Sequence, residues 1–168
     1  MNHSQPKDVW GAGPLYEAYV GRWSRLVAKE FVRCLSAPAG GDWLDVGCGT
    51  GALTRIILED ARPHTITGVD PSPGFIDFAR TTIDDLRISL EVGVAQSLSF
   101  TATSFDLVVS GLMLNFVSQP GPAVAEMVRV TRLGGMVAAY VWDYAGKMEL
   151  LRLFWDGAVT LDPGALDP

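Results

Sequence analysis

The chain has little of several features that mark specialised classes of protein. Two cysteines, Cys34 and Cys48, and two histidines, His3 and His64, give neither a disulfide framework nor the spacing of a zinc site, so we expect no metal. The longest apolar run near the C-terminal end, residues 136–142, is too short to cross a membrane. The first residues are polar and lack the apolar core of a signal peptide. These features predict a cytoplasmic protein without membrane contact.

Basic residues are also scarce. The chain carries 13 Lys and Arg against 19 Asp and Glu, for a net charge of −6, and it has no basic cluster. Nucleic acid is therefore not an expected partner. With 168 residues, 48% hydrophobic and 19% charged, the sequence is typical of one globular domain. We expect a flexible leader over 1–13 and a single domain over 14–168, with a cofactor-binding core at 36–143.

Glycine, in contrast, is concentrated in one stretch, residues 43–51, which read WLDVGCGTG. Apolar residues lead to Asp45, glycines then occupy positions 47, 49 and 51, and a helical pattern of apolar residues follows. This order predicts a strand, a tight turn and the start of a helix. Glycine allows the backbone to approach a ligand closely, and the first N–H groups of a helix lack partners. The stretch therefore predicts a nucleotide or nucleoside site.

Two types of cofactor fit this stretch. Gly47, Gly49 and Ala52 match the dinucleotide pattern G-x-G-x-x-G/A, and Asp70 lies 23 residues after Gly47, where a ribose-binding acid is expected. Asp45 argues against a dinucleotide, because a carboxylate there repels a pyrophosphate. The same carboxylate attracts a cation, and S-adenosylmethionine carries an α-ammonium and a sulfonium.

The segment LDVGCGTGALT resembles the glycine-rich motif of class I S-adenosylmethionine-dependent methyltransferases, and of the small-molecule, quinone-biosynthesis-like type (methyltransferase type 11) in particular. The resemblance extends from about Tyr16 to Asp143 and includes, in the family's order, ITGVDPSPGFIDFAR, SFDLVVSGLMLNFV and EMVRVTRLGGMV. It implies a Rossmann-like, doubly wound α/β sheet, S-adenosylmethionine as cofactor, and transfer of a methyl group to a small-molecule acceptor.

The hydrophobic pattern places the elements of such a fold along the chain. It predicts parallel strands at 42–46, 65–69, 88–92, 105–110 and 136–142. It predicts helices at 14–35, 51–61 and 147–159, a helix capped by Ser72-Pro73 and a helix opened by Gly121-Pro122. Residues 96–104 are expected to form a loop, and 133–135 a tight turn.

The resemblance also implies roles for individual residues. Asp70 would accept hydrogen bonds from the ribose hydroxyls, although a capping role is an alternative, and Arg22 would pair with the methionine carboxylate. Val94 stands where the family often has an acid that accepts from the adenine amino group; it would pack on the ring, while the backbone near Ala95 reads the ring edge. Cys48 is more simply a small turn residue, and Met113 and Phe116 are equally well explained as core. The predicted cofactor-binding residues are Asp45, Gly47, Cys48, Gly49, Gly51, Asp70, Pro71, Val94, Ala95, Ser110, Arg22 and Tyr16, and no catalytic base is identified.

The resemblance finally implies seven strands in the order 3-2-1-4-5-7-6, whereas the pattern predicts five. We therefore expect a shortened methyltransferase without the closing hairpin, in which the apolar strand at 136–142 is an edge. A homodimer through this edge and the last helix, with its Leu150, Leu151, Phe154 and Trp155, would cover it. A cofactor-binding domain with little or no turnover and, less favoured, an NAD(P)-dependent oxidoreductase remain alternatives.

Overall fold

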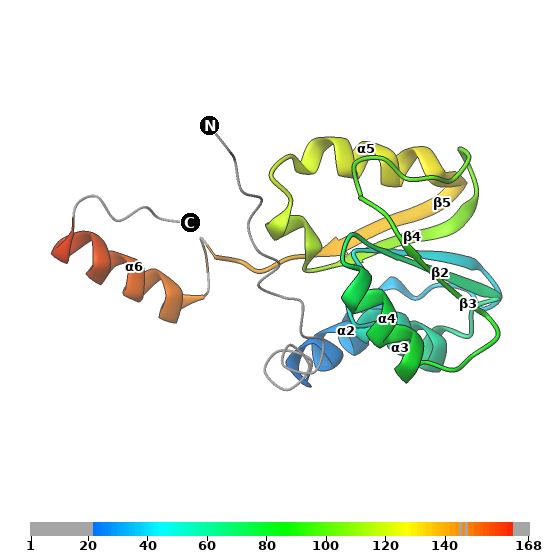
Figure 1. The fold of residues 1–168 in the computed structure, drawn as a ribbon, viewed down its shortest axis with the longest axis horizontal. Coiled ribbons are helices and arrows are strands. Elements are labelled where there is room, and N and C mark those ends of the chain that lie inside the picture. Colours follow the sequence, from blue (N-terminus) through cyan, green and yellow to red (C-terminus); the bar gives the residue numbers. More distant parts are fainter. Residues whose placement is uncertain (1–21, 145, 147, 163–168) are drawn as a thin grey trace.

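The computed structural model describes residues 22–144, 146 and 148–162 (Figure 1). The predicted leader at 1–13 and the predicted helical residues 14–21 lie outside the described part. Five parallel strands form one sheet in the order β3-β2-β1-β4-β5, which confirms the predicted Rossmann-like, doubly wound topology. The strands are β1 (Asp42–Val46), β2 (Thr65–Asp70), β3 (Ile88–Val92), β4 (Phe105–Gly111) and β5 (Thr131–Tyr140).

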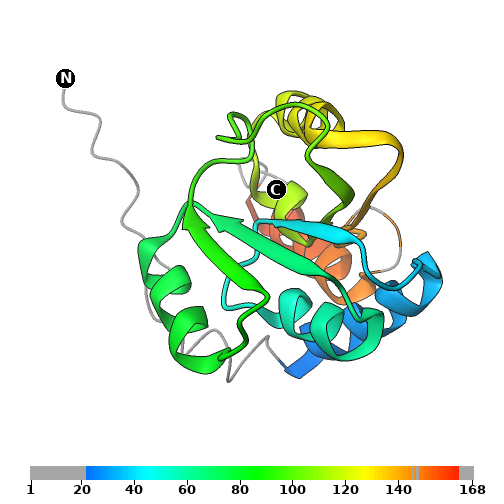
Figure 2. The same ribbon diagram turned by 90° about the vertical axis from the view of Figure 1, so that its right-hand side faces the viewer.

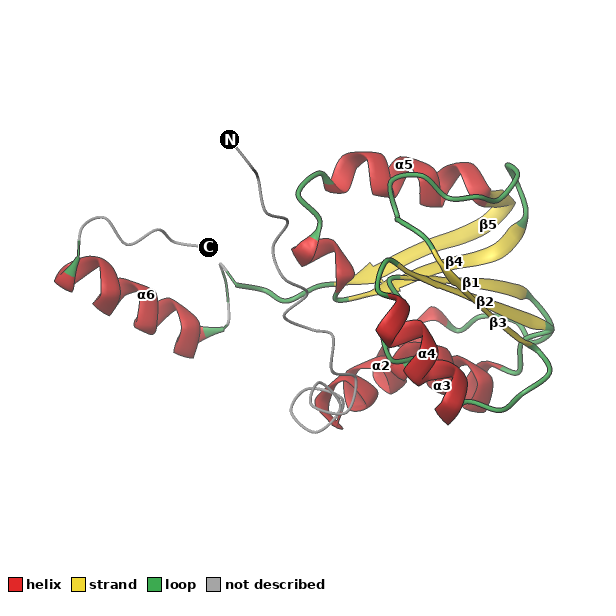
Figure 3. Cartoon of the chain, in the orientation of Figure 1, coloured by secondary structure: helices red, strands yellow, loops and turns green. Residues whose placement is uncertain are grey.

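Helices cover both faces of this sheet, as Figure 2 and Figure 3 show. On one face lie α2 (Arg22–Leu35), α3 (Ala52–Ile56) with its continuation η2 (Ile57–Ala61), and α4 (Pro73–Thr82). On the other face lies α5 (Pro120–Val130). A short 3₁₀ turn, η3 (Met113–Phe116), follows β4, and α6 (Glu149–Leu161) follows β5. Ser72 caps α4 as predicted, since its hydroxyl accepts from the backbone N–H of Phe75 at 3.4 Å.

The core follows from the alternation of side chains along the central strands. Trp43 of β1 is buried on the α2 and α3 face, in a cluster with Ile56 and Ile57. Its neighbour Leu44 points the other way and packs in a cluster with Met127 of α5. β1 is thus the central strand of the sheet, buried on both faces, and the glycine turn begins at its C-terminal end.

Two predicted elements differ from those observed. The helix predicted over 51–61 is α-helical only to Ile56, and its last five residues form a π-helix, for which the sequence gives no signal. The last strand begins at Thr131 and ends at Tyr140, not at 136 and 142. It pairs Thr131 with Phe105 and then Met136 with Leu107, so the residues 133–135, predicted to form a tight turn, form a bulge within β5.

Ion pairs fasten the opposite, N-terminal edge of the sheet. Asp106, at the entrance of β4, accepts from the backbone N–H of Asp42 at 2.9 Å and from Arg132 at 2.7 Å. Arg132 also donates to Asp42 at 3.1 Å, and the Asp42 carboxylate contacts His64 Nδ1 at 2.8 Å. These contacts join β1, β4 and β5 at the edge that does not carry the glycine turn.

β5 is the outer strand of the sheet and is largely exposed. Met136 and Val137 of β5 are each 37% exposed. In the preceding helix α5, Val124 and Val128 are also exposed, and their spacing of four residues places them on one face of the helix. Figure 1 shows α6 standing apart from the sheet, with Leu153, Phe154 and Leu161 exposed. None of the described helices has both the length and the apolar character needed to cross a membrane.

Candidate cofactor site

The glycine turn is built by backbone geometry that only glycine adopts readily. Gly47, Gly49 and Gly51 all have positive φ, at 76°, 54° and 87°. Gly47 and Cys48 donate their N–H groups to the carbonyl of Val69 at 2.7 and 3.1 Å, which fixes the turn against the end of β2. A Cβ on Gly49 would meet nothing within 4 Å, so the space above this residue is open to a ligand.

Gly47 has a second reason to lack a side chain. A Cβ there would collide with the side chain of Met113, which lies directly over the turn. Met113 is held in place by the sharp turn after β4, where Leu112 is a buried non-glycine residue with a φ of 63°. Backbone strain of this kind persists only where the surroundings impose it.

Asp70 connects the turn to the next strand. One carboxylate oxygen accepts from the N–H of Gly49 at 2.9 Å, and the other accepts from the N–H of Ser72 at 2.9 Å. The side chain is almost fully buried. A carboxylate oxygen can accept more than one hydrogen bond, so these backbone contacts do not exclude hydrogen bonds from a ribose. The predicted cap and the predicted ribose acceptor are therefore compatible in one residue.

Asp45 lies beneath the turn and is fully buried. Thr54 of α3 donates its hydroxyl to Oδ2 at 2.7 Å, whereas Oδ1 has no partner among the described residues. Burial raises the pKa of Asp45 to about 7; the Asp70 carboxylate adds to this shift and the Thr54 hydrogen bond opposes it. A buried carboxylate with an unpaired oxygen is costly on its own and becomes favourable beside a cation.

A cavity of about 230 Å³ opens beside the turn. Four of the predicted residues, Gly47, Pro71, Val94 and Ala95, line it together. None of the described residues that line it carries a carboxylate. The backbone near Gln96, which lines it as well, was expected with that of Ala95 to read the ring edge. The other lining residues are Val69, Gly93, Met113, Phe116, Val117 and Ser118.

Its apolar walls and size fit a planar heterocycle. Phe116 is 64% exposed and lies at this cavity, so its interpretation as a core residue is wrong.

The structure does not bring all predicted residues to this cavity. Cys48 packs with Ile76, Ala79 and Leu90, and burial raises the pKa of its thiol well above the usual range, which excludes a nucleophile. Ser110 is buried at the end of β4, and its hydroxyl has no partner among the described residues. Tyr16 and the side chain of Arg22 lie outside the described part of the chain.

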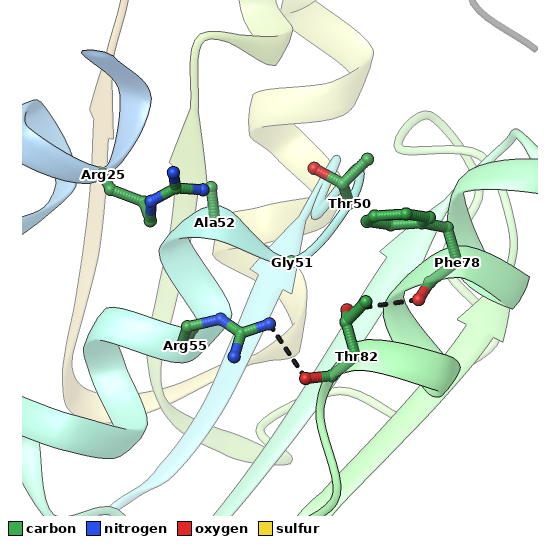
Figure 4. A pocket seen from close by; sticks show the side chains of 7 residues that line it. All are labelled: Arg25, Thr50, Gly51, Ala52, Arg55, Phe78 and Thr82. Carbon is green, nitrogen blue, oxygen red and sulfur yellow. Dashed lines mark hydrogen bonds between the residues drawn. The ribbon is translucent and has the colours of Figure 1, made fainter. Parts of the chain in front are cut away.

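A second cavity, of about 280 Å³, lies on the other side of the turn (Figure 4). Gly51 lines it together with Arg25 of α2 and Arg55 of α3, and none of the described residues in its lining is acidic. Arg55 donates to the carbonyl of Thr82 at 3.0 Å, which fixes its guanidinium at the cavity. Two guanidinium groups make this cavity suited to a carboxylate or phosphate. The basic group implied by the resemblance is Arg22, about one helical turn before Arg25.

Comparison with known proteins identifies the family. Residues 44–139 match the family described as "Methyltransferase domain". The match covers more than half of the chain, so the protein belongs to this family.

Named relatives agree with this family. The chain is 31% identical over 174 residues to 2-methyl-6-phytyl-1,4-hydroquinone methyltransferase of Synechocystis sp., covering 90% of this chain and 54% of the relative. It is 33% identical over 131 residues to malonyl-(acyl-carrier protein) O-methyltransferase of Serratia marcescens, covering 78% of this chain and 49% of the relative. The chain thus spans about half the length of these relatives.

Solved structures share the fold. A putative S-adenosyl-L-methionine-dependent methyltransferase from Methanococcus maripaludis superposes with a TM-score of 0.66 at 19% identity, covering 97% of this chain and 76% of the other. A putative methyltransferase solved in complex with the Haloferax volcanii Trm112 activator superposes with a TM-score of 0.70 at 21% identity, covering 90% and 77%. At these identities the likeness establishes the fold.

Proposed function

We propose that the protein binds S-adenosylmethionine and transfers its methyl group to a small-molecule acceptor. The observation that carries the proposal is the glycine turn, with its three positive φ angles, open above Gly49 and standing over a buried carboxylate that has one unpaired oxygen. Membership of the methyltransferase domain family supports it. The cofactor supplies a methyl carbon already activated by a sulfonium, so the protein's main task is to orient donor and acceptor.

The residues present fit the parts of this cofactor. The cavity of Gly47, Pro71, Val94 and Ala95 suits the adenine ring. Asp70 immediately precedes Pro71 of this lining, and its carboxylate is of the kind that accepts from ribose hydroxyls. The unpaired oxygen of Asp45 suits the α-ammonium, and the basic cavity of Arg25 and Arg55 suits the methionine carboxylate.

Apolar side chains are exposed at the mouth of the adenine cavity. Phe116 and Val94, which line the adenine cavity, are 64% and 48% exposed, so they present apolar surface at its mouth. Hydroquinone methyltransferase is among the relatives, which supports an apolar ring as the acceptor. We infer an apolar small molecule and assign no catalytic base.

Ligand binding tests this proposal against the dinucleotide alternative. Calorimetry with S-adenosylhomocysteine, NAD and NADP should detect binding of the first and none of the other two at millimolar ligand. Binding of NAD without binding of S-adenosylhomocysteine would refute the proposal. Transfer of a radiolabelled methyl group to a panel of hydroquinones then tests turnover; tight cofactor binding with no transfer would favour the alternative of a binding domain without activity.

We further propose that the protein acts in the cytoplasm as a homodimer through β5 and α6. The support is the exposed, nearly uncharged outer strand and the exposed apolar residues of α6. Light scattering at tens of micromolar should give twice the monomer mass. Val137→Lys on β5 should dissociate the dimer into monomers, whereas the control Leu86→Lys, in an exposed loop before β3, should leave it a dimer. A monomeric parent would refute the proposed dimer.

A further inference from the structure

The adenine cavity lacks the side chain that the resemblance led us to expect. Among the residues that the structure describes, its lining contains no carboxylate, and the polar side chains in it are those of Gln96 and Ser118. An amide side chain can rotate by half a turn and exchange its donor and acceptor, so Gln96 alone discriminates poorly between ring edges. A backbone N–H and a backbone C=O cannot exchange. Reading of the ring edge therefore depends on the backbone of the segment 93–97.

This segment is a tight turn anchored at its first end by β2. The N–H of Gly93 donates to the carbonyl of Asp70 at 3.1 Å, and the N–H of Ser97 donates to the carbonyl of Val94 at 3.1 Å. Ala95 is buried in the cluster that includes Met127 of α5. After Ser97 the chain forms a loop up to β4 without helix or strand, so the second end of the turn needs another anchor.

Two side chains of α5 supply that anchor. Glu126 accepts from the backbone N–H of Leu98 at 2.8 Å, and Arg129 donates to the backbone carbonyl of Leu98 at 3.0 Å. Both polar groups of Leu98 are thus held, as they would be in a strand. Arg129 also donates to the carbonyl of Phe100 at 2.8 Å, and it binds Glu126 through two bonds of 2.6 and 2.7 Å.

The charges make this anchor firm. The hydrogen bonds from Arg129 and from the Leu98 N–H lower the pKa of Glu126 to about 2, so both side chains of the pair are charged at neutral pH. Charge-assisted, bidentate contacts are short and directional. The Arg129 and Glu126 side chains keep 36% and 21% exposure, so the pair adds little to overall stability and its removal should leave the fold intact.

We propose that Glu126 and Arg129 are positioning residues that make the site selective for adenine, by holding the backbone of the turn 94–97 at a fixed distance from the ring. The inference rests on the proposed function. Adenine offers an acceptor at N1 and donors at its amino group, whereas hypoxanthine offers a donor at N1 and an acceptor in place of the amino group. A backbone N–H and C=O that are fixed to pair with adenine face a donor and an acceptor of the wrong kind on hypoxanthine, so both backbone groups stay unpaired. A loose turn can adjust to either ring.

Two ligands and matched variants test this. The ligands are S-adenosylhomocysteine and its deaminated analogue, S-inosylhomocysteine, measured by calorimetry. The variant is Arg129→Met. The control is Arg33→Met, which removes the arginine of a second Arg–Glu pair with the same spacing, Arg33 and Glu30, exposed on α2. Hydrogen exchange of residues 94–100 reports whether the turn has loosened.

The parent and Arg33→Met should prefer the adenine ligand by about 30-fold or more, equivalent to about 2 kcal/mol. In Arg129→Met this ratio should fall below about threefold while exchange of 94–100 accelerates and the thermal midpoint moves little. Should Arg129→Met fail to fold, Arg129→Lys, which can donate to only part of the set, should give an intermediate ratio.

If a folded Arg129 variant shows accelerated exchange but an unchanged ratio of the two affinities, this inference is wrong and the proposed function is unaffected. A parent that binds no S-adenosylhomocysteine overturns the proposed function as well, and the two failures are therefore distinguishable.

Discussion

Replacing Asp45 by asparagine should stabilise the ligand-free protein above about pH 7 and should weaken cofactor binding, so one substitution has two effects of opposite sign. Asparagine keeps the acceptor for the Thr54 hydroxyl and removes the buried charge. The folded state holds the Asp45 proton more tightly than the unfolded chain does, because the pKa of Asp45 is raised from 3.8 to about 7. Stability from this group is therefore greatest in acid, and it falls as pH rises from about 4 to about 7.

The magnitude follows from that shift. At 1.36 kcal/mol per pKa unit, ionised Asp45 lowers the free energy of unfolding by about 4 kcal/mol above pH 7, and by only about 1.5 kcal/mol at pH 5. The asparagine amide adds an unpaired donor that costs about 1–3 kcal/mol at any pH. The difference between variant and parent should thus grow by about 2.5 kcal/mol in favour of the variant between pH 5 and pH 8.5.

Urea unfolding of both proteins at pH 5 and 8.5, without ligand, measures this difference. Asp85→Asn is the control: its pKa is lowered to about 2, mainly by hydrogen bonds from Arg87, so its contribution is constant over this range. A variant-minus-parent difference that does not change with pH would show that Asp45 titrates normally and would refute the reasoning.

Calorimetry of S-adenosylhomocysteine at pH 7 provides the second half of the test. If the ligand ammonium meets Asp45, binding ionises the carboxylate, and the parent should release about half a proton, seen as a dependence of the enthalpy on the buffer. Asp45→Asn should bind more weakly by about tenfold or more and release none. Tight binding by the variant would exclude Asp45 from the ammonium site.

Three further substitutions address the rest of the site, each measured by calorimetry with S-adenosylhomocysteine. Asp70→Ala should weaken binding by roughly 1.5–3 kcal/mol per lost charge-assisted bond; undiminished affinity would show that Asp70 supports the turn through its contacts with Gly49 and Ser72 and does not hold the ribose. Val94→Asp should restore an acceptor for the adenine amino group and tighten binding by about 1 kcal/mol, whereas weaker binding with unchanged folding would mean that Val94 packs on the ring. Arg25→Met should weaken binding by about 1–2 kcal/mol but leave the affinity for 5′-methylthioadenosine, which has no carboxylate, unchanged; equal losses for both ligands would remove Arg25 from the carboxylate site.

The strand order and the glycine turn were predictable from the sequence because their signals are local. Parallel strands buried on both faces read as short apolar runs, and the glycines at 47, 49 and 51 occupy positive φ as their spacing suggested. The start of β5 was missed because its first residues, up to Gly135, bulge away from the register and look like a turn. The π-helical end of the first crossover helix has no sequence signature.

The parts of the site that were missed depend on residues far apart in the chain. Arg129 reaches Phe100 across 29 positions and Glu126 reaches Leu98 across 28, and neither pairing shows in composition or periodicity. The acids at 45 and 70 could be located from strand ends, but the contact of Asp45 with Thr54 needs the helix to fold back over the strand. Arg25 was overlooked because an arginine on an amphipathic helix ordinarily faces solvent.

The unpaired oxygen under the glycine turn has a consequence for the amount of protein that a cell maintains. A ligand whose cation pairs with this oxygen, present at a concentration ~100 times its dissociation constant, adds about 2.7 kcal/mol to the stability of the native state. Proteases remove chains in proportion to the fraction that is transiently open, so a gain of that size lengthens the lifetime of each molecule. The abundance of this protein is therefore expected to follow the supply of its small ligand, rising when the ligand is plentiful and falling in starvation, without any change in the rate of synthesis.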